Sequence, residues 1–224
     1  MRLVLFDLDN TLLSGDSDFE WGLFLAAQGV HDREAYEAQN LAFYQDYKAG
    51  TLDIQHFLKF QLGPLGRHSR TELDRWHHQF MQERITPLIS DKARQLVREE
   101  RARADLTAIV TATNRFVTAP IAAAFGIEHL VATEPEVGPD GQFTGKAHGL
   151  PCFREGKIAC VDAWLDALGR RWSDFDTTVF YSDSLNDLPL LRRVSHPVAV
   201  NPDDTLRAHA RAAHWPILEL HASP

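Results

Sequence analysis

The amino-acid sequence predicts a doubly wound α/β fold, in which a parallel sheet carries helices on both faces, with a helical subdomain inserted into it. Two observations predict this fold. Short apolar runs recur along the chain, and amphipathic segments of helical length separate them. A run that is apolar at every position is typical of a strand covered on both faces, and strands that alternate with helices form parallel sheets.

The expected elements follow one another in a regular order over most of the chain. The strand candidates are the apolar runs at 3–6, 106–110, 177–181 and 198–200. The helix candidates are the segments at 90–103, 115–125, 156–168, 185–194 and 203–213. In addition, the Asp-Gly pair at 140–141 between extended residues predicts a β-hairpin over 137–143.

Residues 16–87 interrupt this alternation. Apolar side chains such as Trp21 and Phe24 recur there at helical spacing, glycines and prolines mark turns, and no strand pattern occurs. We therefore expect an α/β core formed by residues 1–15 and 88–224, and a helical cap formed by residues 16–87.

The composition is that of an ordinary globular protein. The chain has 224 residues, of which 44% are hydrophobic and 24% charged, enough for one domain with a modest insertion. Its 23 Lys and Arg and 31 Asp and Glu give a formal net charge of −8. This balance argues against nucleic acid or an anionic membrane as the main partner, because cationic side chains bind both. A small charged substrate fits, and the sequence indicates no oligomeric state.

Cysteine usage and the N-terminus predict a cytoplasmic protein. Cys152 and Cys160 are the only cysteines, too few for a disulfide framework and without the paired spacing of a zinc site. The apolar run at 3–6 ends at Asp7, so it is too short for a signal peptide or a membrane span. The histidines also lack the spacing of metal ligands.

Polar side chains follow three of the expected strands. Asp7 and Asp9 come after the first strand, the segment 111–114 follows the second, and the segment 183–187 follows the strand at 177–181. Ligands of doubly wound sheets bind beyond the carboxyl ends of the strands. Acids, hydroxyls and amides from three strands are therefore expected at one edge of the sheet.

This set of side chains suits phosphoryl transfer. Asp7 is the candidate nucleophile, and a carboxylate can attack an anionic phosphate only if a cation neutralises both. Oxygen ligands without His or Cys favour Mg²⁺, with Asp7, Asp183 and Asp187 as candidate ligands.

The remaining parts of the reaction have candidates as well. Asp9 is placed to protonate the departing alkoxide and then to deprotonate the water that cleaves an aspartyl phosphate. Lys157 and the Thr111 hydroxyl are expected to hold the phosphoryl oxygens.

Four motifs in this order resemble those of the haloacid dehalogenase (HAD) superfamily of phosphatases: DLDNT at 7–11, TATN at 111–114, Lys157 in EGK, and YSDSLND at 181–187. The resemblance implies a Rossmann-like core and an Mg²⁺-dependent phosphatase acting through an aspartyl phosphate. It also implies that the Asp9 main-chain carbonyl binds the metal. The further residues expected at the phosphate are Thr11, Ala112, Thr113 and Asn186.

The chain is most similar to the phosphoserine phosphatase branch, with three departures. Asp16 stands where these enzymes carry a Glu that binds the substrate amine. Gln61 stands at the position of their carboxylate-binding Arg, with the nearby Lys59 as the alternative. A neutral amide binds a carboxylate poorly, so we expect histidinol phosphate, an amine without a carboxylate, ahead of phosphoserine. Ser182 replaces a usual Gly, which the fold tolerates if φ is negative there.

Two other functions share parts of this pattern and stay open. A phosphotransferase would pass the phosphoryl group to an organic acceptor instead of water. A non-catalytic, phospho-accepting signalling module also combines acidic residues, a Ser or Thr and a Lys, although such modules are usually shorter and have no helical cap.

Overall fold

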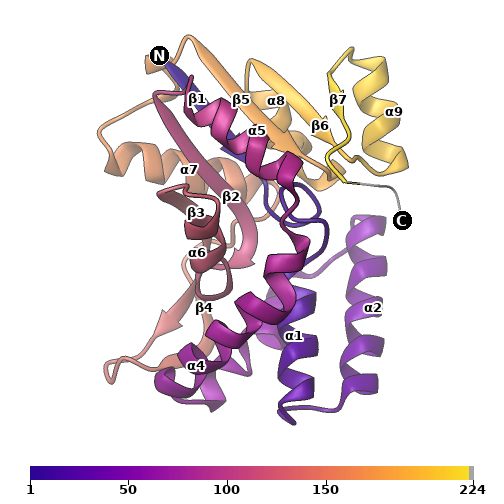
Figure 1. Ribbon diagram of the computed structural model, residues 1–224, viewed down its shortest axis with the longest axis vertical. Coiled ribbons are helices and arrows are strands. Elements are labelled where there is room, and N and C mark those ends of the chain that lie inside the picture. Colours follow the sequence, from indigo (N-terminus) through magenta and orange to yellow (C-terminus); the bar gives the residue numbers. More distant parts are fainter. Residues whose placement is uncertain (222–224) are drawn as a thin grey trace.

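The computed structural model describes residues 1–221, and its centre is one seven-stranded sheet with helices on both faces (Figure 1). The strand order is β4-β3-β2-β1-β5-β6-β7. All neighbours pair in parallel except β3 and β4. The strands are β1 (Arg2–Phe6), β2 (Leu106–Asn114), β3 (His129–Val137), β4 (Phe143–His148), β5 (Thr177–Ser182), β6 (His196–Val200) and β7 (Ile217–Leu218). The predicted doubly wound fold is confirmed.

Helices alternate with these strands along the chain from α5 onward, and α5 lies directly before β2. They are α5 (Asp91–Arg101), α6 (Arg115–Ala124), α7 (Glu155–Ala167), α8 (Leu188–Arg193) and α9 (Asp204–Ala212). Each overlaps a predicted helix. The predicted helix at 185–194 begins as a 3₁₀ turn over Leu185–Asp187 and becomes α-helical only from Leu188.

The alternation of side chains along β1 explains the two layers of the core. Leu3 and Leu5 pack into the cluster beneath α7, α8 and α9, whereas Val4 and Phe6 pack into the cluster that contains α5 and α6. All four side chains are fully buried. A strand with two apolar faces needs helices on both sides, as its sequence predicts.

Between β1 and β2 the chain forms a helical insertion that we define as residues 17–88. It contains α1 (Ser17–Ala27), α2 (Arg33–Ala49), α3 (Ile54–Leu62), α4 (Arg70–Phe80) and short turns up to Leu88. In Figure 1 the insertion lies below the sheet, at the end where β1 terminates. Its side chains, including Trp21 and Phe80, share one hydrophobic cluster with the sheet. The division into a core and a cap stays a prediction.

Polar N-caps fix where the helices begin. In most of the α-helices an Asp, Ser or Asn side chain accepts an N–H from the first turn, which satisfies a donor that the helix leaves free. Asp16 caps α1 and Asn114 caps α6. Both caps place the start of a helix at the carboxyl edge of the sheet.

The sequence patterns missed two strands and identified one hairpin. No apolar run marked β3 or β7, because β3 mixes polar and apolar residues and β7 has only two residues. The predicted hairpin is confirmed: β3 ends at Val137, β4 begins at Phe143, and Gly141 in the turn has φ 78°. Within residues 1–221, no helix has the length and apolar character needed to cross a membrane.

Candidate active site

The turn after β1 places two carboxylates at the sheet edge. The Leu12 and Leu13 N–H groups both donate to the Leu8 carbonyl, and Asn10 has φ 58°, a conformation that Asn tolerates. The chain therefore folds back directly after Asp7. This tight turn keeps Asp7 at the end of β1 and directs the next carboxylate, Asp9, toward the start of α1.

Asp7 and Asp183 converge on one hydroxyl group. Thr11 Oγ1 lies 3.0 Å from Asp7 Oδ2 and 3.1 Å from Asp183 Oδ1. The Asp183 N–H donates to the same Thr11 oxygen at 3.0 Å. Two carboxylates from neighbouring strands, β1 and β5, are thus held around one point, as the motif order predicts.

Lys157 connects the nucleophile candidate to the last motif. Its ammonium donates to Asp7 Oδ1 and to Asp187 Oδ2, both at 2.7 Å. The lysine is 3% exposed, and it is the one cation that forms an ion pair with these acids in the described part of the chain. Burial favours the neutral amine, but Asp187 and Asp7 hold the pKa of Lys157 well above its usual range. The ammonium is therefore charged.

The acids outnumber this single cation. Burial raises the pKa of Asp7 to about 7, although Lys157 opposes the shift. Burial also raises the pKa of Asp183 well above its usual range, and the charges of Asp7 and Asp187 add to the effect. A further positive charge at this point would favour the ionised form of each acid.

Asp9 lies in a separate set of hydrogen bonds. Its Oδ1 accepts the Ser17 N–H at 2.7 Å, and its Oδ2 accepts the hydroxyls of Thr113 at 2.9 Å and Thr111 at 3.3 Å. Loss of hydration and the charge of Asp16 raise the pKa of Asp9 to about 6. A carboxyl with this pKa exchanges its proton near neutral pH, as a general acid and base must.

The donor set fits a hard divalent cation. Asp7 and Asp183 offer oxygen ligands around one point, in a region whose acids exceed its cations. Within residues 1–221, no three or more Asp, Glu, His or Cys side chains surround a common point as ligands. Mg²⁺ typically binds one or two carboxylates and keeps several waters, so two carboxylates are compatible with it.

Ser182 supports Asp187, a contact that the sequence did not indicate. Its hydroxyl donates to Asp187 Oδ2 at 2.7 Å and accepts the Ser184 N–H at 3.2 Å. A Gly, the usual residue of the family, has no such hydroxyl. Ser182 is not among the residues with positive φ, so the fold tolerates this departure as expected.

The helical insertion contacts the loop after β5 through Tyr47 and Asn186. The Tyr47 hydroxyl lies 2.5 Å from Ser184 Oγ, and Asn186 Nδ2 donates to the Tyr47 carbonyl at 3.2 Å. Arg154, with φ 51° and ψ −123°, donates to Asn186 Oδ1 at 2.9 Å. Asn186, expected at the phosphate, is thus bonded to the insertion and to Arg154 instead.

The other predicted residues are less closely grouped. Ala112 lies between Thr111 and Thr113 at the end of β2. Asp16 is an exposed N-cap whose Oδ1 accepts the Phe19 N–H at 2.9 Å. Gln61 is buried in α3 and forms no hydrogen bond with the acids around Asp7.

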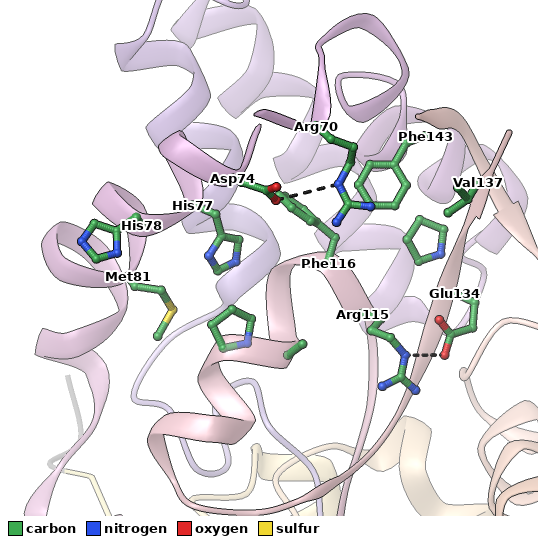
Figure 2. A pocket seen from close by; sticks show the side chains of 13 residues that line it. Arg70, Asp74, His77, His78, Met81, Arg115, Phe116, Glu134, Val137 and Phe143 are labelled. Atoms are coloured by element: carbon green, nitrogen blue, oxygen red, sulfur yellow. Dashed lines mark hydrogen bonds and ion pairs between the residues drawn. The ribbon is translucent and has the colours of Figure 1, made fainter. Parts of the chain in front are cut away.

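A surface hollow lies apart from these residues. It has a volume of about 560 Å³ and opens between α4, α6 and the β3–β4 hairpin (Figure 2). Phe116 and Phe143 form part of its wall, with Arg70 beside Asp74 and Arg115 paired with Glu134. None of the predicted site residues lines it. The buried charges, not this hollow, therefore locate the chemistry.

Comparison with known proteins identifies the class. Residues 4–192 match the model of the haloacid dehalogenase-like hydrolase family, and the chain belongs to this family. The match confirms the resemblance and the expectation of a HAD-type phosphatase.

Individual proteins of similar sequence or structure are the following. A protein of Neisseria meningitidis named histidinol-phosphatase is 47% identical over 217 residues, covering 97% of this chain and 98% of the relative. A structure of a protein of unknown function from Bordetella pertussis is 47% identical, with a TM-score of 0.92 and coverage of 98% and 99%. A phospho-aspartyl intermediate analogue of phosphoserine phosphatase is 18% identical, with a TM-score of 0.69 and coverage of 99% and 94%, and shows the shared fold.

Proposed function

We propose that this protein is an Mg²⁺-dependent phosphatase that hydrolyses histidinol phosphate through an aspartyl-phosphate intermediate on Asp7. The observation that carries the proposal is the convergence of Asp7 and Asp183 on Thr11, with Lys157 bonded to Asp7. This arrangement holds a nucleophile beside a cation and leaves negative charge for a second cation. A phosphate ester needs both to meet a carboxylate.

In the first step, a carboxylate oxygen of Asp7 attacks phosphorus and the ester P–O bond breaks. The departing alkoxide takes a proton from Asp9, whose pKa of about 6 leaves part of the population protonated near neutral pH. Lys157 and Thr111 hold the phosphoryl oxygens. The products are the free alcohol and phospho-Asp7.

In the second step, Asp9, now ionised, takes a proton from water, and the water oxygen attacks phosphorus. The bond between phosphorus and Asp7 breaks, which releases inorganic phosphate and restores both carboxyls. The hydroxyls of Thr111 and Thr113 bond to the same Asp9 oxygen and hold it in place for both transfers.

The residues that would hold Mg²⁺ are Asp7, Asp183 and the Asp9 main-chain carbonyl. The bound cation supplies charge neutralisation between the acidic nucleophile and the anionic ester. Asp187, which we expected as a ligand, accepts hydrogen bonds from Lys157 and Ser182, so we propose that it chiefly positions Lys157.

The helical insertion supplies the cap of the proposed enzyme. The contacts of Tyr47 with Ser184 and Asn186 hold this insertion against the loop after β5, at the edge of the sheet. We propose that these contacts open for substrate entry and close to exclude bulk water. The protein would act in the cytoplasm on a small phosphorylated metabolite, without nucleic acid or membrane as a partner.

The choice of histidinol phosphate has two supports. The relative named histidinol-phosphatase is 47% identical over nearly its whole length. Gln61, near the position of a carboxylate-binding Arg, is a neutral amide bonded to Tyr36. A neutral amide binds the carboxylate of phosphoserine more weakly than an Arg does.

Phosphate release tests the proposal. We expect histidinol phosphate to give a higher kcat/KM than phosphoserine, chelation to stop turnover, and Mg²⁺ to restore it. Asp7→Asn is expected to lower kcat by at least about 10⁴-fold, because the nucleophile is lost. Asp166→Asn, on the exposed face of α7, is the matched control.

Three results would contradict parts of the proposal. Near-normal phosphate release by freshly purified Asp7→Asn would show that Asp7 is not the nucleophile. A preference for phosphoserine would show that histidinol phosphate is not the main substrate. Phosphate release that falls when alcohols are added, with phosphorylated alcohols formed instead, would favour a phosphotransferase.

A further inference from the structure

Asp18 is a buried acid without a cationic partner. It lies in the first turn of α1 and is 4% exposed. Its carboxylate accepts a hydrogen bond from Asn114 Nδ2 at 3.4 Å, and the Thr113 hydroxyl also favours its ionised form. None of the ion pairs in this part of the chain includes Asp18. A carboxylate in such a place is costly unless a cation balances it, so the cation must come from outside the described chain or the acid must stay protonated.

The charged groups that act on Asp18 are acids as well. Burial raises the pKa of Asp18 well above its usual range, and the charges of Asp16 and Asp9 raise it further. No Lys, Arg or His contributes. The region at the start of α1 therefore concentrates negative charge that only a positively charged group can relieve.

Two unpaired polar atoms belong to residues near Asp18 in the fold. Ser17 and Gln61 are 0% and 5% exposed, and neither Ser17 Oγ nor Gln61 Nε2 has a hydrogen-bond partner in the described residues. Ser17 precedes Asp18 in α1, and Gln61 is linked to the Asp18 main chain through Tyr36, whose hydroxyl lies 3.3 Å from the Asp18 carbonyl and 3.4 Å from Gln61 Oε1. Buried polar atoms without partners are rare in native proteins, and a bound ligand can supply the missing partner.

The packing around Tyr36 holds this arrangement in place. A Cβ atom at Gly22 would lie 1.9 Å from a Tyr36 ring carbon, so the ring packs directly on the main chain of α1. Phe60 stacks on the ring with a centroid distance of 5.2 Å. The tyrosine hydroxyl therefore stays between α1 and Gln61 of α3.

The contacts of Asp18 place it next to the leaving-group side of the reaction. Asp9 is bonded to Ser17 and to Thr113, and the residues that follow these two, Asp18 and Asn114, are bonded to each other. The hydrogen bonds of Asp18 thus run beside those of Asp9, between the start of α1 and the end of β2. A substrate with its ester oxygen at Asp9 would extend its organic part toward Asp18.

We propose that the Asp18 carboxylate binds the protonated nitrogen of an amine-bearing phosphomonoester, with Ser17 Oγ and Gln61 Nε2 as additional polar partners. This inference rests on the proposed function. It assigns the recognition of the amine to Asp18 rather than to Asp16, which is exposed and occupied as the N-cap of α1. Asp18 is accordingly a specificity-determining residue.

Selectivity between two substrates tests this assignment. The probes are histidinol phosphate, which carries an amine, and para-nitrophenyl phosphate, which carries none. We expect Asp18→Asn to lower the ratio of their kcat/KM values by at least about tenfold, chiefly through KM, because a ground-state contact is lost. Asp16→Asn keeps the N-cap, and we expect it to change the ratio by less than about threefold, since exposed charges contribute little.

Thermal unfolding provides a second readout. Asp18→Asn removes buried like-charge repulsion and keeps an acceptor for Asn114, so we expect the Tm to rise by about 3 °C. A lower Tm, or a variant that fails to fold, would show that Asp18 is purely structural and would overturn the inference. An unchanged substrate ratio, or a larger selective loss in Asp16→Asn, would overturn it too. If the unaltered protein releases phosphate from neither substrate, the proposed function itself fails.

Discussion

Asp7 and Asp18 both lie near the start of the sequence, but the charges around them are compensated differently. Asp7 and Asp187 each accept a 2.7 Å hydrogen bond from Lys157. Asp18 accepts one 3.4 Å bond from the neutral amide of Asn114. The first group carries a cation within the fold, and the second carries none among the described residues.

This difference follows from what each group must do. A nucleophile must keep one orientation through every turnover, and a buried lysine bonded to two acids fixes that orientation. A substrate-binding acid has to remain free for a cation that arrives and leaves. The comparison teaches that an uncompensated buried charge marks a place for a ligand, whereas a compensated one marks resident machinery.

Of the changes considered, loss of the Lys157 ammonium is expected to have the largest effect on stability and activity. In Lys157→Met the carboxylates of Asp7 and Asp187 lose their common cation, so we expect the free energy of unfolding to fall by about 3 kcal/mol at neutral pH. We also expect kcat to fall by about 10²-fold to 10³-fold, because a donor to the phosphoryl oxygens is lost. Urea unfolding and phosphate release measure the two effects.

A double variant separates charge from packing at this position. Lys157→Met combined with Asp187→Asn removes one of the stranded acids, so we expect part of the lost stability to return. A single variant as stable as the unaltered protein would show that Lys157 does not compensate these acids.

Asp9→Asn tests the acid and base assigned between the two groups. We expect kcat to fall by about 10²-fold to 10⁴-fold with histidinol phosphate, because its alkoxide leaves poorly without a proton. The release of para-nitrophenolate, which needs no proton, is expected to suffer less in pre-steady-state bursts. Equal losses of burst rate with both substrates would argue that Asp9 acts only by holding the start of α1.

The sequence predicted the parts of the site that lie in strand-end motifs. Asp7, Thr11 and Asp183 follow predicted strands, and parallel pairing of β1 with β5 brings them to one edge. Lys157 could be placed only through the order of the motifs. The sequence could indicate their common position because strand ends meet at one edge wherever the chain pairs in parallel.

Residues whose role depends on helix packing could not be predicted in the same way. Asp18 has an ordinary position in a first helical turn, and its burial is visible only in the folded chain. Tyr47 contacts Ser184 because of where α2 ends, and no local pattern indicates this. Gln61 was found from its place in a resemblance, whereas its unpaired Nε2 is visible only in the folded chain.

His77 shows a third way of burying a titratable group, as a neutral ring. It is 5% exposed, lies 2.9 Å through Nε2 from the Val117 carbonyl, and contacts the Trp21 ring. Burial lowers the pKa of His77 below its usual 6.5. As the pH falls through 6.5, the unfolded chain binds a proton that the folded chain excludes, so the stability that His77 contributes at neutral pH is lost toward acid.

His77→Gln keeps a donor for Val117 but cannot titrate, so we expect its stability to depend less on pH between 6.5 and the lower pKa of the folded protein. The difference in slope is expected to reach at most about 1.4 kcal/mol per pH unit. Urea unfolding across this range measures it, and His78→Gln, at the exposed neighbouring position, is the matched control. If both variants keep the slope of the unaltered protein, His77 binds its proton equally well in the folded and the unfolded chain. Burial would then not keep this ring neutral, and His77 would be one more buried charge that needs a partner.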